Sequence, residues 1–265
     1  MSGSREVLLM FGIKDTGTNL EIYRRGALFT RYVYTGFLKP FLGPVLTPDG
    51  ESYTRADESN PEHPHQRSVY VGHGEVELEG HPMLDFWNEP NDSGIAEHVR
   101  FEELERERFT ALNLWRSRDG VPYLDERRSY AFVDECGAAV IDHTITFTAS
   151  YGKITLGPTK EAGPFAIRVS DSLRGDRGGK IENAEGLAGE RECWGKVSPW
   201  CKYSGTLGGK QVSIKVIDDP SNPEWPTAWH VRDYGLFAAN NFYFKGGCTV
   251  EAGQSISWRF KIIFS

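Results

Sequence analysis

The sequence predicts an all-β protein built as a large antiparallel sandwich, and three observations lead to this prediction. Short segments rich in Val, Ile, Thr and Phe alternate apolar with polar residues, which is typical of half-buried strands. Clusters of Gly, Pro, Asn and Asp separate them and suit antiparallel turns, and the chain holds 29 glycines. No internal repeat or linker is visible. We therefore expect one β-sandwich domain over residues 1–265.

The expected strands follow one another along the chain. They lie at residues 75–80, 138–150, 152–157, 165–173, 211–218 and 256–264. A helix competes only over residues 96–116, where Leu104, Phe109 and Leu112 fall near helical spacing. We favour strands there, because residues 106–116 and 120–133 flank the turn residues SRDG as the arms of a long hairpin.

Composition and charge narrow the class of partner. The 30 basic and 37 acidic residues give a formal net charge of −7, which does not match the positive surface of nucleic-acid-binding proteins. The sequence has no window of 18 uninterrupted apolar residues, and the apolar run at residues 7–11 is too short for a signal peptide or a membrane span. We expect a cytoplasmic protein that acts on a small molecule and binds neither nucleic acid nor membrane.

Residues 61–74, PEHPHQRSVYVGHG, hold three of the seven histidines. His63 precedes a proline, which favours extended backbone, and continued extension would place His63, His65 and Arg67 on one face. Two imidazoles on one face suit a divalent ion, while Arg67 would lower their pKa values and bind an anion. The alternative is a polar loop whose histidines bond to the backbone.

A second polar stretch runs from Asp218 to Phe242 and holds His230, Arg232 and Tyr234. Its prolines and asparagines predict a long ordered loop instead of a regular element, and rigid loops on a β scaffold often carry sites. Alternation along an extended segment would aim the three side chains one way. The alternative is a structural loop anchored by its tryptophans.

Two further stretches add polar and aromatic candidates. Lys160 and Glu161 are expected at the end of a strand before a Gly-Pro turn, either as site residues or as a solvated surface pair. Further along, glycines are interleaved with Asn183, Glu185 and Trp194. This composition suits a sugar-binding wall, where rings stack on C–H faces and carboxylates or amides bind hydroxyls. It suits a packed sandwich edge almost equally well.

Six blocks follow one another in order from about Lys39 to Asn241. They read KPFLGPVLTPDG, HPHQRSVYVGHGEV, LDFW, TKEAGPFAIRV, NAEGLAGERECWGKVSPWCKYSG and DDPSNPEWPTAWHVRDYGLFAANNF. Together these blocks resemble the family of PmoA, or methane-oxygenase-like, proteins. The family name implies a membrane oxygenase, which we set aside because the sequence holds no spanning segment. The resemblance implies instead a soluble protein linked to carbohydrate catabolism, with a supersandwich similar to galactose mutarotase.

The resemblance also assigns recurrent polar positions of the family to residues of this chain. They are His63, His65, Arg67, His73, Lys160, Glu161, Asn183, Glu185, Trp194, Asn222, His230, Arg232 and Tyr234. Two positions depart from the family pattern: Asp219 stands where relatives have the histidine of a DHP sequence, and Asn241 stands where they have the proline of an NPF sequence. The departure at Asp219 bears on a metal site. This departure either weakens a metal site or supplies a carboxylate as third ligand beside His63 and His65.

We expect an enzyme, namely a lyase, isomerase or hydrolase that moves protons at carbon in a carbohydrate or a related polyol or carbonyl compound. Such reactions need a base, an acid and a cation beside the developing oxyanion. His65 and His230 are the expected acid/base pair, with Glu161 as an alternative base. Arg67 and Arg232 are expected to bind the oxyanion or the hydroxyl groups of the substrate, and we call them clamps.

The sequence also suggests further substrate contacts and leaves the metal and the function open. Substrate contacts are also expected from Lys160, Asn183, Glu185, Trp194 and Tyr234. No cofactor is required, but a divalent metal on His63, His65 and Asp219 is an alternative. Two other functions compete with the enzyme: a carbohydrate-binding sandwich without catalysis, and a cyclase or isomerase of secondary metabolism that acts on a non-sugar substrate. The sequence indicates no oligomeric state.

Overall fold

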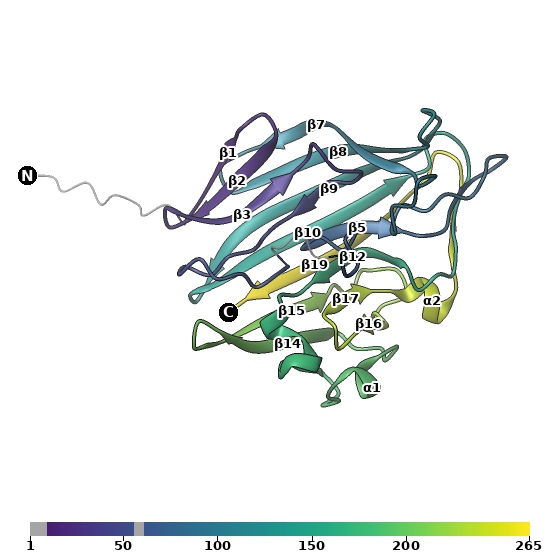
Figure 1. Ribbon diagram of the computed structural model, residues 1–265. Coiled ribbons are helices and arrows are strands. Elements are labelled where there is room, and N and C mark those ends of the chain that lie inside the picture. The colour runs from purple at the N-terminus through teal and green to yellow at the C-terminus, as the bar shows by residue number, and fades with distance from the viewer. Residues whose placement is uncertain (1–9, 56–60) are drawn as a thin grey trace, which may run out of the picture.

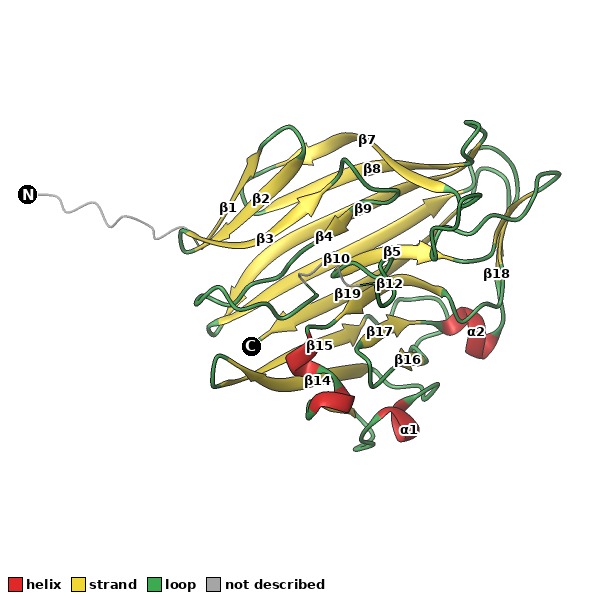
Figure 2. Cartoon of the chain, in the orientation of Figure 1, coloured by secondary structure: helices red, strands yellow, loops and turns green. Residues whose placement is uncertain are grey.

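The computed structural model describes residues 10–55 and 61–265, and it consists mainly of two large antiparallel sheets (Figures 1 and 2). The strands of the first sheet, in spatial order, are β1 (Phe11–Asp15), β2 (Asn19–Arg24), β3 (Ala27–Val33), β4 (Phe41–Leu42), β5 (Val69–His73), β12 (Ala162–Arg168), β17 (Leu236–Ala239) and β16 (Trp229–Val231). Those of the second sheet are β13 (Lys180–Asn183), β14 (Trp200–Leu207), β15 (Lys210–Asp218), β19 (Ser255–Phe264), β10 (Ala138–Thr148), β9 (Pro122–Glu135), β8 (Arg108–Arg116) and β7 (Ile95–Leu104).

The remaining elements are short. A small third sheet has the order β18 (Cys248–Val250), β11 (Ile154–Leu156) and β6 (Val76–Leu78). The helices are α1 (Glu190–Cys193), α2 (Asn241–Lys245) and the 3₁₀ turns η1 (Asp171–Leu173) and η2 (Gly175–Arg177). Figure 2 shows α1 and α2 near the edge of the first sheet that β16 forms.

The predicted all-β antiparallel sandwich is confirmed. Each of the six expected strand segments overlaps a strand, and the expected hairpin is the antiparallel pair β8 and β9. The expected strand at 165–173 extends too far, because β12 ends at Arg168 and residues 171–173 form η1. Residues 96–116 form β7 and β8, so the helical alternative is wrong. The expectation of one domain over residues 1–265 stays a prediction, and residues 7–9 of the N-terminal apolar run lie outside the described part. Among the described residues, no helix is long and apolar enough to cross a membrane.

Aromatic pairs between the sheets hold the sandwich together. The ring centroids of Phe165 on β12 and Phe260 on β19 are 5.2 Å apart, and those of Phe237 on β17 and Tyr203 on β14 are 4.9 Å apart. Such pairs add about 0.5–1.5 kcal/mol each beyond the burial of their area. The strands β12 and β17 are thereby fixed on the second sheet.

A buried ion pair on β9 also joins the two sheets. Arg128 and Glu126 are both fully buried, and the Arg128 guanidinium donates to both carboxylate oxygens, at 2.5 and 2.9 Å. The guanidinium also donates to the carbonyl of Pro40, next to β4, and Trp115 Nε1 donates to Glu126. A buried charge in such a network is costly to leave without its partner.

Two local predictions were wrong. The stretch from Asp218 to Phe242 is not one long loop, because it contains β16 and β17, which pair with each other. Lys160 and Glu161 precede β12 and do not end a strand, and the Gly-Pro pair lies inside β12. There the register shifts between Gly163 and Ala166, which marks a bulge. A Cβ on Gly163 would come within 2.8 Å of the Ala239 carbonyl, so glycine is needed at this position.

We predict that Arg128→Met lowers the free energy of unfolding by about 3–5 kcal/mol, because it leaves the Glu126 charge buried without its cation. Arg127→Met is the matched control on the same strand, since Arg127 makes an exposed ion pair with Glu102 and should cost less than about 1 kcal/mol. Urea unfolding measures both values. Equal losses for the two variants would contradict the role given to the buried pair.

Candidate functional site

The candidate site lies on the face of the first sheet that points away from the second sheet. Strand register aligns Tyr70, Ala166, Ala238 and His230 in one row across β5, β12, β17 and β16. Tyr70, Ala166 and Ala238 belong to a small apolar cluster separate from the main core. Because the two central side chains of the row are methyl groups, the row leaves space above the sheet beside His230.

The adjacent row of the sheet brings charged residues to the same face. Arg168 pairs with Leu236, and the Arg232 amide donates to the Leu236 carbonyl. Side chains two residues apart on a strand share a face, so Arg168 and Arg232 lie on the side of His230 and the alanines. The sheet itself therefore positions three of the basic groups around the site.

These rows border a pocket of about 150 Å³. It is lined by His63, His65, Gln66, Trp87, Asn88, Lys160, Glu161, His230, Arg232, Tyr234 and Leu236. Seven of these eleven residues were candidates from the sequence, and they come from three separate stretches of the chain. The structure thus brings His63, His65, Lys160, Glu161, His230, Arg232 and Tyr234 together.

His230 has a fixed orientation and one free ring nitrogen. Its Nδ1 lies 3.0 Å from the carbonyl oxygen of Lys160, which can only accept, so Nδ1 carries the proton. Its Nε2 is buried and has no hydrogen-bond partner among the described residues. Burial, followed by the charge of Arg232, lowers the pKa of His230 to about 4. At neutral pH the ring is therefore uncharged, with a bare lone pair on Nε2.

The other two pocket histidines are also held towards the neutral form. Burial, assisted by the charge of Lys39, lowers the pKa of His65 to about 3. Burial and then Arg168 lower the pKa of His63. The His63 ring stacks on Tyr234 with centroids 4.7 Å apart and an interplanar angle of 7°.

The backbone at His63 differs from the prediction. Its φ is +51°, in the left-handed region, so the extended conformation expected before Pro64 is wrong. The Gln66 amide donates to the His63 carbonyl and closes a turn. The turn still places both imidazoles at the pocket, with ring centroids 6.0 Å apart, but not through strand alternation.

Arg67 does not line the pocket with the histidines. Its guanidinium makes a bidentate pair with Glu89, at 2.6 and 3.0 Å, and lies over the ring of Phe37. Glu89 also accepts from the buried ammonium of Lys39, whose pKa burial lowers to about 8 against the opposing effect of Glu89. Arg67 is therefore part of a charged network beside the pocket, and its clamp role stays untested.

Arg232 and its neighbours form the other side of the pocket. Arg232 Nη1 donates to Glu190 at 2.8 Å, whereas its Nε is buried and has no partner among the described residues. Its guanidinium carbon lies 6.0 Å from the ring centroid of Trp194. The Trp194 and His230 rings are perpendicular, with an interplanar angle of 89° and centroids 6.3 Å apart. Trp194 thus adjoins the pocket without lining it.

Three other candidates lie elsewhere. The buried Asn183 accepts from the amides of Glu185 and Leu187 and so closes a turn, and Glu185 is exposed. Asp219 borders a different hollow beside Arg259 and accepts from Ser221. The structure therefore does not place Asp219 with the histidines. Within residues 10–55 and 61–265, no group of three or more His, Cys, Asp and Glu side chains is arranged to hold a metal ion.

Sequence reasoning missed several residues of the site. Gln66, Trp87 and Asn88 line the pocket, and the buried Arg168 guanidinium lies 4.6 Å from the Tyr234 ring centroid and donates to Gln66. A signal was available only for Arg168, as a charged residue inside an otherwise apolar strand segment. Gln66 and Trp87 lie inside stretches that the sequence singled out, but nothing local distinguished them from their neighbours, and Asn88 gave no signal.

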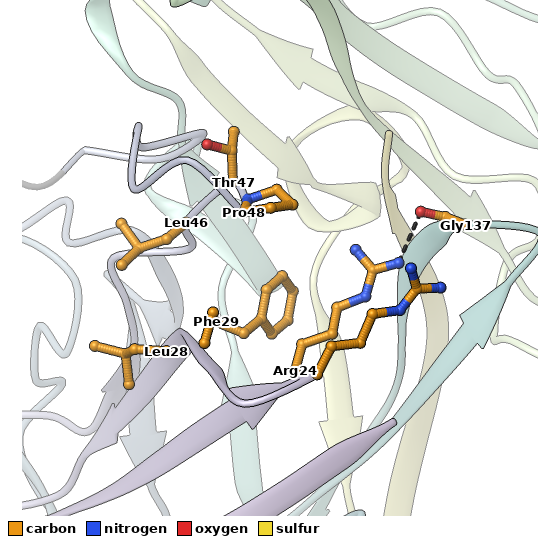
Figure 3. A pocket seen from close by; sticks show the side chains of 9 residues that line it. Arg24, Leu28, Phe29, Leu46, Thr47, Pro48 and Gly137 are labelled. Carbon is orange, nitrogen blue, oxygen red and sulfur yellow. Dashed lines mark hydrogen bonds between the residues drawn. The ribbon is translucent and has the colours of Figure 1, made fainter. Parts of the chain in front are cut away.

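A second hollow, of about 220 Å³, is larger than the candidate pocket but has a different chemical character (Figure 3). Its lining includes Leu28, Phe29, Leu46 and Pro48. The Arg24 guanidinium at its edge is already paired with Asp134 and donates to the Gly137 carbonyl, the bond drawn in Figure 3. With no imidazole in its lining, it offers no proton-transfer group of the kind that the first pocket holds.

The fold and the site together define a β-sandwich protein with a polar, histidine-lined pocket on the outer face of one sheet. The family model described as "Family of unknown function (DUF6807)" matches residues 19–265, and the chain belongs to this family. No curated protein matches the sequence. The comparisons do not support the narrower resemblance to PmoA proteins.

Solved structures of low identity are similar to the chain. One is a galactose mutarotase-like protein from Lactobacillus casei ATCC 334, with 9% identity, 96% of this chain and 100% of that chain covered, and a TM-score of 0.45. Another is a galactose mutarotase related enzyme from Lactobacillus acidophilus, with 9% identity, 97% of each chain and a TM-score of 0.40. The alpha-galactosidase from Lactobacillus brevis has 10% identity and a TM-score of 0.49, over 96% of this chain and 39% of that chain. These likenesses carry no information about activity.

We predict that the stability of the fold decreases as the pH falls from about 6.5 towards 4. Since the folded-state pKa of His230 is about 4 and an unfolded histidine has about 6.5, the unfolded state binds the additional proton in this window. His230→Gln should therefore reduce the pH dependence, by up to about 1.4 kcal/mol per pH unit. Urea unfolding at several pH values measures it. An unchanged dependence in the variant would contradict the buried, neutral state of His230.

Proposed function

We propose that this protein is an enzyme that transfers protons at carbon in a small carbohydrate or a related polyol or carbonyl compound. The observation that carries the proposal is the state of His230. Its Nδ1 proton is committed to the Lys160 carbonyl, and its bare Nε2 has no protein partner in the described residues that surround the pocket. A neutral imidazole with a free lone pair on a residue that lines the pocket is in the form that a general base requires.

The size and lining of the pocket favour a single hydroxylated ring. A cavity of about 150 Å³ is known to accommodate a molecule the size of benzene. Imidazoles, an amide pair, an ammonium, a carboxylate and a phenol surround the pocket, so each hydroxyl or carbonyl of a sugar ring would find a donor or acceptor. An apolar ring of the same size would leave these groups unsatisfied.

The proposed reaction begins when His230 Nε2 takes a proton from a carbon next to a carbonyl. Negative charge then develops on the carbonyl oxygen, and the Arg232 guanidinium and the Lys160 ammonium are the donors that would stabilise it. The Arg232 charge is the second cause of the lowered pKa of His230. An oxyanion beside Arg232 would offset that effect and make His230 more basic as the proton moves.

The return of the proton would distinguish the reaction classes. If a proton relayed from solvent through His65 reaches the opposite face of the carbon, while the His230 imidazolium returns its own proton to solvent, the product is an epimer. If a neighbouring oxygen leaves with the proton that His230 took up, the product is that of an elimination. Glu161, which accepts from Thr159 and lies 3.7 Å from the Lys160 ammonium, is the alternative base. The proposal thus covers an isomerase or a lyase, and a hydrolase where water attacks instead.

The proposal also includes three narrower points from the sequence. They are that the protein resembles the PmoA family, that it is cytoplasmic, and that His63 and His65 are able to bind a divalent metal. For a metal, these two imidazoles would supply two ligands, and Asp219 is not beside them. Arg67 enters the proposal as a residue that holds Glu89 and Lys39 near His65, not as a clamp.

We predict that His230→Gln lowers the rate of proton exchange at carbon at least about 100-fold, while the unfolded fraction stays negligible. The assay incubates aldoses, uronates and keto-sugars with the protein in D₂O and follows deuterium uptake and product formation by NMR. The matched control is His143→Gln, because His143 is buried in the sandwich and stacks on Tyr130 at 4.1 Å. It should lower stability and leave the rate per folded molecule unchanged.

Two outcomes would contradict the proposal. One is full exchange activity in His230→Gln. The other is sugar binding in the wild type without any exchange or product, which would indicate a carbohydrate-binding protein without catalysis.

A further inference from the structure

A cluster of aromatic rings adjoins the pocket beside His230. The Trp194 ring meets Phe244 edge to face at 4.8 Å and Tyr243 at 6.1 Å between centroids, and it lies 6.3 Å from His230. Tyr243 is 45% exposed. The rings therefore form a continuous path from the proposed base to an exposed aromatic surface, which we call the aromatic shelf (Trp194, Tyr243 and Phe244).

Exposed apolar side chains also occur on segments that neighbour the shelf in the fold. The exposed residues Trp225 and Val197 lie on segments bound to it: the Lys245 ammonium of α2 donates to the Pro226 carbonyl, and Val197 bridges Ala228. Single exposed hydrophobic residues are ordinary on a protein surface, so it is the ring contacts of the shelf itself that indicate a binding surface.

Hydrogen bonds fix the position of the aromatic shelf relative to His230, the proposed base. Asn240 Nδ2 donates to the Lys160 carbonyl at 3.0 Å, the same oxygen that accepts from His230 Nδ1. Asn240 Oδ1 accepts from the Tyr243 amide and so caps α2. One peptide carbonyl thus fixes both the orientation of His230 and the start of the helix that carries Tyr243 and Phe244.

Unpartnered donors lie between the pocket and the shelf. Trp194 Nε1 and Arg232 Nε are both buried, and neither has a hydrogen-bond partner in the described part of the chain. Buried N–H groups without a partner are rare and destabilising. An acceptor oxygen of a bound molecule in this region would satisfy them.

We propose that the substrate is a conjugate, in which a sugar-sized ring fills the pocket and an attached aromatic group lies on the aromatic shelf. The proposal rests on the proposed function, because it takes the pocket as the site of the sugar ring. That pocket has room for about one ring, so any second part of the molecule must lie outside it, and the shelf begins at His230. The linking oxygen would accept from Trp194 Nε1 or Arg232 Nε once the side chains that cover these two atoms move aside on binding.

The shelf favours an aromatic group over a second sugar. Polar side chains beside it are already engaged: the Lys245 ammonium and the Asn241 amide both donate to backbone carbonyls of the segment 223–226. The shelf therefore offers ring faces more than hydrogen bonds. Ring faces stack on another aromatic group through offset or edge contacts.

The test compares matched phenyl and methyl glycosides of keto-sugars and of glucuronic acid, which keep a carbonyl or carboxyl group beside a C–H bond, with affinities measured by calorimetry. We expect at least one phenyl glycoside to bind at least 10-fold more tightly than its methyl counterpart. Tyr243→Ala should reduce this preference to less than 3-fold and leave the affinity for the methyl glycoside unchanged. The matched control is Tyr151→Ala, since Tyr151 is equally exposed, at 44%, on another segment, and it should keep the full preference.

Equal affinities for phenyl and methyl glycosides, or a preference that survives Tyr243→Ala, would overturn the inference and leave the proposed function standing. A disaccharide that binds more tightly than every phenyl glycoside would also overturn it, in favour of a second sugar. If no glycoside binds but free sugars still exchange deuterium, the inference alone falls. If neither binding nor exchange is seen, the inference and the proposed function fall together.

Discussion

The site depends on one backbone oxygen, the carbonyl of Lys160. It accepts from His230 Nδ1 and from Asn240 Nδ2, each at 3.0 Å. The first bond fixes the neutral tautomer of the imidazole and leaves Nε2 bare, and the second anchors α2 and its aromatic rings beside the pocket. The carbonyl in turn lies just before β12, a strand that is buried on both faces and fixed on the second sheet by Phe165. The packed sandwich thereby fixes the position of this carbonyl, and the carbonyl fixes the orientation of the His230 imidazole.

The electrostatics of the pocket follow from burial more than from any one charge. Burial is the largest cause of the lowered pKa values of His63, His65 and His230, and the nearby cations Arg168, Lys39 and Arg232 add to it. The result is a set of neutral imidazoles beside guanidinium and ammonium groups. Such an environment keeps the imidazoles in the deprotonated form that a base needs and attracts oxygens that carry negative charge. The same lowered pKa makes His230 a weak base in the free protein, and an oxyanion beside Arg232 would raise its basicity during proton abstraction.

The alternation of apolar and polar residues predicted the fold, and the polar residues of a few short stretches predicted much of the pocket lining. The contacts between those stretches could not be predicted from the sequence. Alternation of period two was enough to find strands such as β10, β15 and β19, because one face of each is buried. Pairs far apart in sequence, such as Arg67 with Glu89 and His230 with the Lys160 backbone, depend on sheet register, which no local pattern encodes. The turn at His63 misled prediction because its left-handed backbone opposes the usual preference before proline.

The central claim is that His230 is neutral at pH 7, with its proton on Nδ1 and a free Nε2. Two-dimensional ¹⁵N–¹H NMR of the imidazole ring, assigned by comparison with the His230→Gln variant, tests it most directly. The account predicts a protonated, pyrrole-like Nδ1 and an unprotonated, pyridine-like Nε2 at pH 7, and the same pattern at pH 5.5. An Nε2–H tautomer, or an imidazolium with both nitrogens protonated at pH 7, would contradict it.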